Sequence, residues 1–348
     1  MISRVAKLIY AEFFYFFFSI FFTLVFLGSA YRITTIEQSE LLYMSSKNIF
    51  LSFIYSLPFI CLIVVPVAYL FAMFFTYNKL YSTGELLGIF TSKISGKRLS
   101  KLFFIPTAIL VFLLFINAHL LRPKAELELF KILNLNTAQY IKSLKPNIVN
   151  NLKSNKFIFF TETNKQNEFY NVLFYQYHSE KNSLKAMSSK KMILFEPLTL
   201  LFQDGTDFQI KDGDFTYYQF SSFQMPLISN AEIKIRPQIL PTKALLLLSL
   251  KSSSAQKEAV ELFERILLPL APLIFFLFIF PLSLCLDKRQ FFVFLPYLVV
   301  CVLFFSIVLL SHSLGKKDIL IAFVIYPSVI VFELACGIIF FIKRLKAH

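Results

Sequence analysis

The sequence predicts a membrane α-helical bundle of six transmembrane helices, three before and three after an inserted all-β domain. Hydrophobic residues make up 57% of the 348 residues and charged residues only 16%, which excludes an ordinary water-soluble globule. Six apolar runs approach or exceed the roughly 20 residues that a helix needs to cross a bilayer. Between the third and fourth runs lies a polar block of about 140 residues that carries short, strand-like segments.

The apolar runs fix the order of the helices along the chain. The first run is too long for a removed signal peptide and lacks a small-residue cleavage site, so we expect it to remain as a helix. The predicted division is residues 1–121 for the first three helices, 122–259 for the inserted domain with its linkers, and 260–348 for the last three. The six runs are residues 8–31, 49–76, 102–121, 266–286, 291–311 and 319–342.

Basic residues in the short loops predict the orientation. Twelve lysines and arginines fall on one side and four on the other, so we expect both termini in the cytoplasm and the β block in the periplasm. If the cell is a bacterium with two membranes, the protein is expected to be multi-pass in its inner membrane. Orientation also accounts for the net charge of +14, so we expect no nucleic-acid binding. The twelve are Arg4, Lys7, Lys79, Lys93, Lys97, Arg98, Lys101, Lys288, Arg289, Lys343, Arg344 and Lys346.

The cytoplasmic segment 79–101, KLYSTGELLGIFTSKISGKRLSK, predicts a short amphipathic helix. Ser82 and Glu85 have the S-x-x-E spacing of a capping box, which predicts a helix over about residues 82–95 that ends at Gly96. The helix either lies in the membrane interface or docks on a partner protein. The side chains expected at such a docking surface are Ser82, Glu85, Leu86, Leu87 and Phe90.

The polar block predicts a small β sandwich or roll. The dipeptides Asp204-Gly205 and Asp212-Gly213 are expected to form turns. The many phenylalanines and tyrosines are expected to form the core of this domain, and alternating members are a second candidate for lining an acyl-chain slot. Strands are predicted at residues 156–162, 168–178, 191–203, 207–211 and 214–220.

Motifs for catalysis are missing from the sequence. The four histidines are scattered, and neither H-E-x-x-H, G-x-S-x-G nor a complete phosphate-binding loop occurs. All four cysteines lie in apolar runs without metal-binding spacing, so we expect neither a disulfide nor a metal site. We therefore expect a transport subunit that is no enzyme and needs no cofactor, and any nucleotide hydrolysis would belong to another chain.

Charged side chains near the ends of the apolar runs predict two kinds of contact. Basic residues at the outer ends either anchor the helices by snorkelling or form a collar for lipid phosphates, since arginine presents a fork of donors. Glu12 and Glu333 lie within apolar runs, where a carboxylate faces the bundle interior or a partner. The predicted lipid contacts are Arg32, His119, Arg122 and Arg265.

Three segments carry a resemblance to a known family. They are NKLYSTGEL at residues 78–86, LTLLFQDG at 198–205 and ELFERILLPLAPLIFFLFIFPLSL at 261–284. With the three-plus-three arrangement of spans, they make the chain resemble the LptF/LptG permeases of lipopolysaccharide export over essentially its whole length. The KLYSTGEL segment is more similar to LptF than to LptG. The resemblance implies a β-jellyroll as the periplasmic domain.

The resemblance also implies partners and roles. The cytoplasmic helix would be the coupling helix, whose Glu85 docks on an LptB-type ATPase dimer, and Arg32 would contact lipid phosphate and sugar. A second permease of the same family and an LptC-type single-span protein would complete the complex. Lipopolysaccharide would pass from the membrane into a cavity between the permeases and then into the jellyroll.

Two other classes of protein remain as alternatives. A permease of the FtsX or MacB type usually has four spans with the outer domain after the first, unlike the division seen here. A membrane-anchored enzyme of envelope lipids would need clustered acid, base or metal-binding groups at the outer surface. The aspartates of the β block fall in predicted turns, where aspartate is common, so they indicate no such cluster.

Overall fold

The structure is a computed structural model that divides into two compact units. One unit comprises Met1–Ala30, Ser56–Glu126 and Pro237–His348, and the other comprises Tyr31–Tyr55 and Leu127–Arg236. The structure describes residues 2–34, 44–92, 94–142, 145–152, 157–165, 168–178, 183–195, 199–211, 214–226, 237–251, 256–285, 290–315, 328, 331–339 and 341–343.

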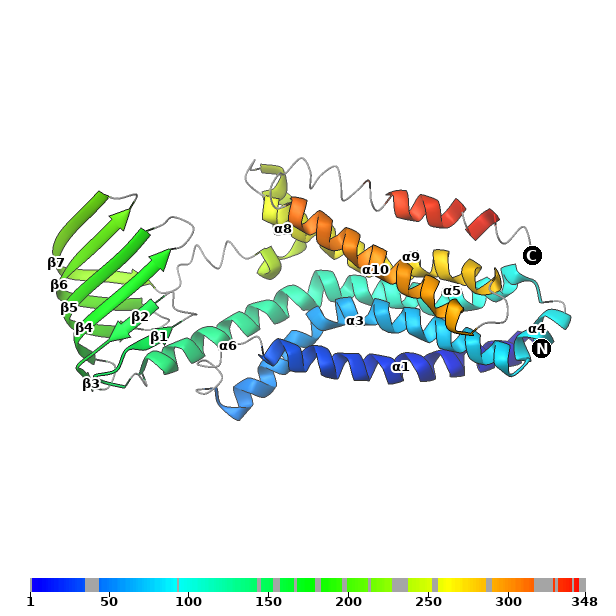
Figure 1. Ribbon diagram of the computed structural model, residues 1–348, viewed down its shortest axis with the longest axis horizontal. Coiled ribbons are helices and arrows are strands. Elements are labelled where there is room, and N and C mark those ends of the chain that lie inside the picture. Colours follow the sequence, from blue (N-terminus) through cyan, green and yellow to red (C-terminus); the bar gives the residue numbers. More distant parts are fainter. Residues whose placement is uncertain are drawn as a thin grey trace. The chain divides into compact units, whose positions relative to one another are not determined.

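Long apolar helices form the first unit and run on into the second (Figure 1). Within the described residues, four helices are long and apolar enough to cross a membrane, and helix α10 (Gln290–Gly315) has a shorter apolar part. These helices confirm a membrane helical protein. Half of the sixth predicted span, 319–342, lies outside the described residues, and the described residues 328, 331–339 and 341–343 are helical. The four are α1 (Ile2–Thr34), α3 (Ser46–Ser82), α5 (Gly96–Ile116) continuing through η1 (Asn117–Leu121) into α6 (Arg122–Lys142), and α9 (Gln256–Cys285).

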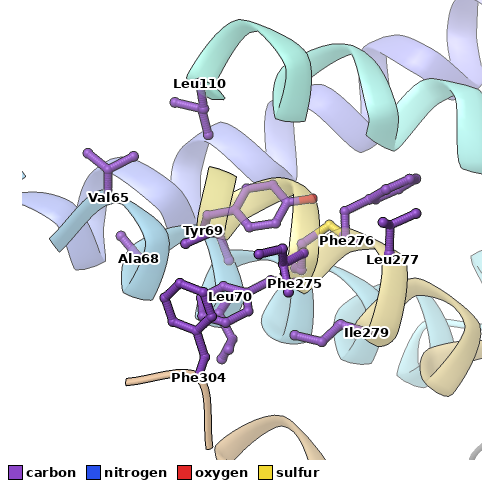
Figure 2. Packing of buried hydrophobic residues seen from close by; sticks show 14 of the residues in the cluster. Val65, Ala68, Tyr69, Leu70, Leu110, Phe275, Phe276, Leu277, Ile279 and Phe304 are labelled. Atoms are coloured by element: carbon purple, nitrogen blue, oxygen red, sulfur yellow. The ribbon is translucent and has the colours of Figure 1, made fainter. Parts of the chain in front are cut away.

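Aromatic side chains and a few buried hydroxyls hold the helices of the first unit together. Figure 2 shows Tyr69 of α3 and Phe275 of α9 in this core, with Phe304 of α10 beside them. The rings of Phe275 and Phe304 meet edge to face, with centroids 5.2 Å apart. The hydroxyl of Tyr69 lies 2.7 Å from that of Thr107 on α5, so a polar group buried among apolar side chains has its partner.

The second unit contains an antiparallel sheet that confirms an inserted β domain (Figure 1). Its strands follow the order β1-β2-β4-β5-β6-β7, and β3 pairs with β4. The described strands therefore form a meander in which neighbours along this path pair with each other. Their bounds are β1 (Asn150–Leu152), β2 (Phe157–Phe160), β3 (Thr163–Lys165), β4 (Glu168–His178), β5 (Ser183–Phe195), β6 (Thr199–Lys211) and β7 (Asp214–Pro226).

The strands agree with the sequence prediction only in part. Strand β4 has the predicted bounds of 168–178. The predicted strand 191–203 was wrong as a single element, because its first part ends β5 and its last part begins β6. Glu196 and Pro197 interrupt the apolar residues at that junction, and the proline is a signal against a continuous strand that the prediction did not use. The predicted turn at 212–213 lies outside the described residues.

The predicted turn at Asp204-Gly205 was also wrong, because both residues lie inside β6. Asp204 has a left-handed φ of 49°, and Asn171 on β4 has a φ of 50°. The regular pairing of β4, β5 and β6 skips both residues. On β4 the buried side chains on either side of Asn171 are Phe169 and Val172, which are three residues apart instead of two. The left-handed residues therefore shift which side chains face the core instead of reversing the chain.

An ion pair joins β4 to β5 at the surface of the sheet. The Nζ of Lys191 lies 2.8 Å from Oε1 of Glu168, and the hydroxyl of Tyr170 donates to Oε2 at 2.7 Å. The hydrogen bond from Lys191, with that from Tyr170, lowers the pKa of Glu168, and the same contact raises the pKa of Lys191. Because these groups are solvated, the pair fixes the strands' relative alignment more than it adds stability.

We expect Gly205→Ala to disrupt this sheet. A Cβ at Gly205 would lie 2.2 Å from the backbone oxygen of Ser188 and 2.6 Å from Cζ of Phe220, so backbone would have to move. The free energy of unfolding should fall by about 2 kcal/mol or more. Thermal unfolding and limited proteolysis of the full-length protein in detergent would measure this. Gly88→Ala is the matched control, since a Cβ there meets nothing within 4 Å, and equal stability of both variants would contradict the expectation.

Candidate coupling helix and buried ionic cluster

A short helix, α4 (Glu85–Thr91), connects the spans α3 and α5. It follows Gly84, whose φ of 75° lies in the left-handed region that glycine adopts without strain. The predicted capping box is wrong, because α4 has no side-chain cap and the hydroxyl of Ser82 donates back to the carbonyl of Lys79 at 3.0 Å. Ser82 still belongs to α3, so its hydroxyl bonds to its own helix.

The two faces of α4 have different surroundings. Leu86 and Ile89 are each 5% exposed and anchor the helix on the rest of the first unit. Leu87 is 69% exposed and Phe90 38%, and Glu85 is exposed beside them. Of the predicted docking surface, the structure therefore places Ser82, Glu85, Leu87 and Phe90 outside and Leu86 inside. Spacing alone does not separate the two faces of a helix this short.

Helix α4 ends earlier than predicted. Its last residue is Thr91, and the hydroxyls of Thr91 and Ser92 both donate to the carbonyl of Gly88, at 3.0 and 2.7 Å. Gly96 was expected to stop the helix, but it is the first residue of α5. The amide of Ser92 also donates to this carbonyl, at 3.1 Å, so the carbonyl of Gly88 accepts the ordinary helical bond together with two side-chain bonds at the end of the helix.

An ion pair ties the segment before α4 to another span. The Nζ of Lys79, in the last turn of α3, lies 2.7 Å from both carboxylate oxygens of Glu12 on α1. Glu12 was predicted to face the bundle or a partner, and it faces this lysine. The pair adds a polar contact between α1 and α3 to the ring contact of Phe13 with Tyr69.

Three of the predicted lipid contacts lie together in a buried ionic cluster with Glu261. Arg122 of α6 contacts Glu261 of α9 through both ends of its fork, with Nη1 3.0 Å from Oε1 and Nη2 3.1 Å from Oε2. The side chains of Arg122 and Glu261 are each 3% exposed. Arg265, four residues after Glu261, donates from Nε to Oε1 at 2.9 Å. Nδ1 of His119 lies 2.9 Å from the hydroxyl of Thr242, the first residue of α8 (Thr242–Lys251).

Arg265 has no exposed surface, and all of its donors are directed to protein acceptors. Nη2 donates to the carbonyls of Pro237 and Gln238, at 3.2 and 3.0 Å. Nη1 donates to the carbonyl of Leu240 at 2.9 Å and to the hydroxyl of Thr242 at 3.3 Å. The guanidinium therefore satisfies the carbonyls of the 3₁₀ helix η3 (Pro237–Ile239) and of the turn that follows it.

The predicted collar of exposed lipid ligands differs from this arrangement. His119, Arg122 and Arg265 bond to protein groups inside the first unit, so they hold helices together in the structure. Arg32 lies in the last turn of α1 with a half-buried side chain and belongs to the second unit. Among the described residues, no three His, Cys, Asp or Glu side chains are grouped so as to hold a metal ion.

A π-helical turn positions Arg122. Helix η1 inserts this turn between α5 and α6, and the amide of Arg122 donates to the carbonyl of Asn117, five residues earlier. Asn117 donates from Nδ2 to the carbonyl of Pro58 on α3 at 2.8 Å, while the guanidinium of Arg122 lies over the ring of Phe59, 5.4 Å from its centre. Both side chains therefore meet neighbouring residues of α3.

The sequence contained one overlooked signal for this cluster. Glu261 and Arg265 are four residues apart, the spacing at which side chains meet on a helix. Glu264 is adjacent to Arg265 in the chain, but it lies about 100° away around the helix. The acceptors at Pro237 and Gln238, and the contact of Lys79 with Glu12, carry no comparable signal in the sequence.

Comparison with protein families gives a match over nearly the whole chain. The family model "Lipopolysaccharide export system permease LptF/LptG" matches residues 7–343. Comparison with curated individual proteins gives no match. The match extends from α1 through the β domain and beyond α10, so it covers both of the units described above. The chain therefore belongs to the LptF/LptG family of lipopolysaccharide export permeases.

Proposed function

We propose that this chain is the transmembrane subunit of an ATP-driven lipopolysaccharide exporter, and that a separate ATPase drives it by gripping α4. The observation that carries the proposal is the division of α4 into two faces. Leu86 and Ile89 fasten the helix to its own chain, and Glu85, Leu87 and Phe90 are left exposed. A charged residue flanked by exposed apolar side chains on an anchored helix is a suitable docking patch for a protein partner.

The connections of α4 support a role in transmitting force. It follows α3 after only two residues, and α5 begins at Gly96, five residues after α4 ends. The bond between Lys79 and Glu12 adds α1 to the same assembly. A displacement imposed on α4 would therefore reach three spans as a rigid-body movement of packed elements.

The proposed movement of the spans extracts a lipid with several acyl chains from the membrane. Exposing those chains to water costs about 25 cal/mol per Å² of apolar surface, so an apolar path lowers the barrier to extraction. We propose that the path runs from the outer leaflet of the inner membrane, through a cavity shared with a second LptF/LptG-type permease, to the periplasmic β domain. An LptB-type ATPase dimer and an LptC-type single-span protein complete the proposed complex, and both termini of this chain lie in the cytoplasm.

The β domain offers one further support for this path. Strand β7 ends the order of described strands and carries exposed aromatic side chains at Phe215, Tyr217 and Tyr218. An edge strand can pair with a strand of another β domain, and this would lengthen an apolar surface from one protein to the next.

Glu85→Lys tests the docking of the ATPase. Reversing the charge on the exposed face of α4 should lower the recovery of the ATPase with the tagged, detergent-solubilised protein by about tenfold or more. Thr91→Lys is the control, because it also places a lysine on α4, with a charge change of +1 instead of +2, near the end where the helix dipole favours a positive charge. If Glu85→Lys leaves the ATPase recovery unchanged, α4 is not the docking site.

The two faces of α4 should respond differently to truncation. Leu87→Ala should weaken ATPase binding and leave the unfolding temperature unchanged, because this side chain is exposed. Leu86→Ala should remove about 2–3 kcal/mol of stability, because this side chain is buried. Co-purification and thermal unfolding of the same preparations separate the two effects. Equal loss of ATPase without loss of stability in both variants would contradict the assignment of faces.

Arg32→Glu tests the proposed lipid contact. Because arginine donates charge-assisted hydrogen bonds to phosphate, its reversal should lower photo-crosslinking of lipopolysaccharide by about tenfold. Assembly with the partner subunits should be unchanged. Lys47→Glu, at the exposed first turn of α3, applies the same change of charge at a position with no proposed contact. Equal crosslinking in wild type and Arg32→Glu would leave Arg32 as an anchor of α1.

A further inference from the structure

Glu261 is the carboxylate that both arginines of the buried cluster share. Its Oε1 contacts Arg122 at 3.0 Å and Arg265 at 2.9 Å, while Oε2 accepts a hydrogen bond from Arg122 at 3.1 Å. All three side chains are 3% exposed or less. Two guanidinium groups therefore depend on one carboxylate in surroundings where water cannot replace it.

One of these contacts fixes the chain where it leaves for the β domain. Arg122 begins α6, which continues without a break from α5 and leads toward residue 142. The π-helical turn before it also directs Asn117 to the carbonyl of Pro58. Arg122 is thus held on one side by the ring of Phe59 on α3 and on the other by Glu261 on α9.

The other contact fixes the chain where it returns from the β domain. Pro237 is the first described residue after β7, and its carbonyl accepts from Arg265. Gln238 and Leu240 bond to the same guanidinium, and Thr242 bonds to both Arg265 and His119. Arg265 therefore holds the returning segment, and Glu261 holds Arg265 in position.

We propose that Glu261 is a positioning residue that joins both connections of the β domain to the transmembrane helix α9. The outgoing helix α6 and the returning segment 237–242 then move as one body with α9 when the spans move. The role in transport rests on the proposed function, whereas the joining of the two segments does not. Arg122 belongs to the outgoing helix and Arg265 bonds to the returning segment, so Glu261, which contacts both arginines, links the two segments. The bond between His119 and Thr242 is a second link between them.

Hydrogen exchange of the full-length protein in lipid nanodiscs tests the joining directly. Glu261→Gln should speed amide exchange about tenfold or more in both peptides, 117–133 and 237–251, because it leaves two buried guanidinium groups without their anion. Arg122→Met should speed exchange in 117–133 alone, and Arg265→Met in 237–251 alone. Glu258→Gln, in the first turn of the same helix and outside the cluster, should change neither.

The pattern across the variants decides the matter. If Glu261→Gln affects only one peptide, or if either arginine variant affects both equally, Glu261 is not the shared joint and the proposal is overturned. Each arginine variant leaves the other arginine paired with Glu261 and removes the cluster's net charge of +1. These two variants therefore still distinguish the outcomes if Glu261→Gln fails to fold.

A transport measurement distinguishes positioning from stability. In the reconstituted complex, Glu261→Gln should release severalfold less lipopolysaccharide per ATP hydrolysed, while the ATPase still co-purifies as in wild type. Unchanged release per ATP, together with the expected exchange pattern, would reject the role in transport. Absence of any ATPase partner would instead reject the proposed function, and the exchange measurement would remain valid.

Discussion

A charged group inside an apolar helical bundle is stable only when protein groups satisfy it, and the beginning of α9 is organised around this constraint. Glu261 and Arg265 lie one turn apart there and have almost no exposed surface. Removing one partner from a buried ion pair typically costs about 3–5 kcal/mol, because the remaining charge is left uncompensated. The positions of α6, η3 and α8 follow from where these two side chains need their acceptors and donors.

The stability of the loop that contains α4 has a different origin. Helix α4 has only seven residues, too few for a helix to be stable in water by itself. It persists because Leu86 and Ile89 are buried and because Gly84 permits the sharp turn from α3. Leu87 and Phe90 are exposed on the other face, which the proposed ATPase would contact.

Hydropathy predicted the helical class because a bilayer fixes the length of an apolar helix, and it predicted β4 because turn residues bound that strand clearly. Local motifs were less reliable. Ser82 and Glu85 have capping-box spacing, but α3 continues through Ser82 and removes it from the cap. Asp204 precedes a glycine as in a turn, yet β6 accommodates its left-handed backbone in the middle of the strand. In both cases the surrounding structure overrode the local preference.

The role of Arg265 was hidden for a different reason. Its acceptors at Pro237, Gln238 and Leu240 are backbone carbonyls more than twenty residues away in the chain. A pattern of side chains does not predict which backbone carbonyls will accept its hydrogen bonds. From sequence alone, an arginine at the end of a span is therefore predicted to bind lipid, whereas the fold shows which protein groups accept its hydrogen bonds. The position of Arg32 at the end of α1 agrees with both a lipid contact and an anchor of the helix.

A continuous helix connects the two sites. The helix Gly96–Leu133 begins just after α4 and reaches Arg122 and beyond, so at about 1.5 Å per residue it spans more than 50 Å. In a regular α-helix, Asn117 and Arg122 would point about 140° apart, and only one of them could face α3. The π-helical turn brings both to the same side, so Asn117 reaches Pro58 while Arg122 still reaches Glu261. The turn thus fixes the rotation of this helix at the ionic cluster, to which a displacement of α4 would be transmitted in the proposed mechanism.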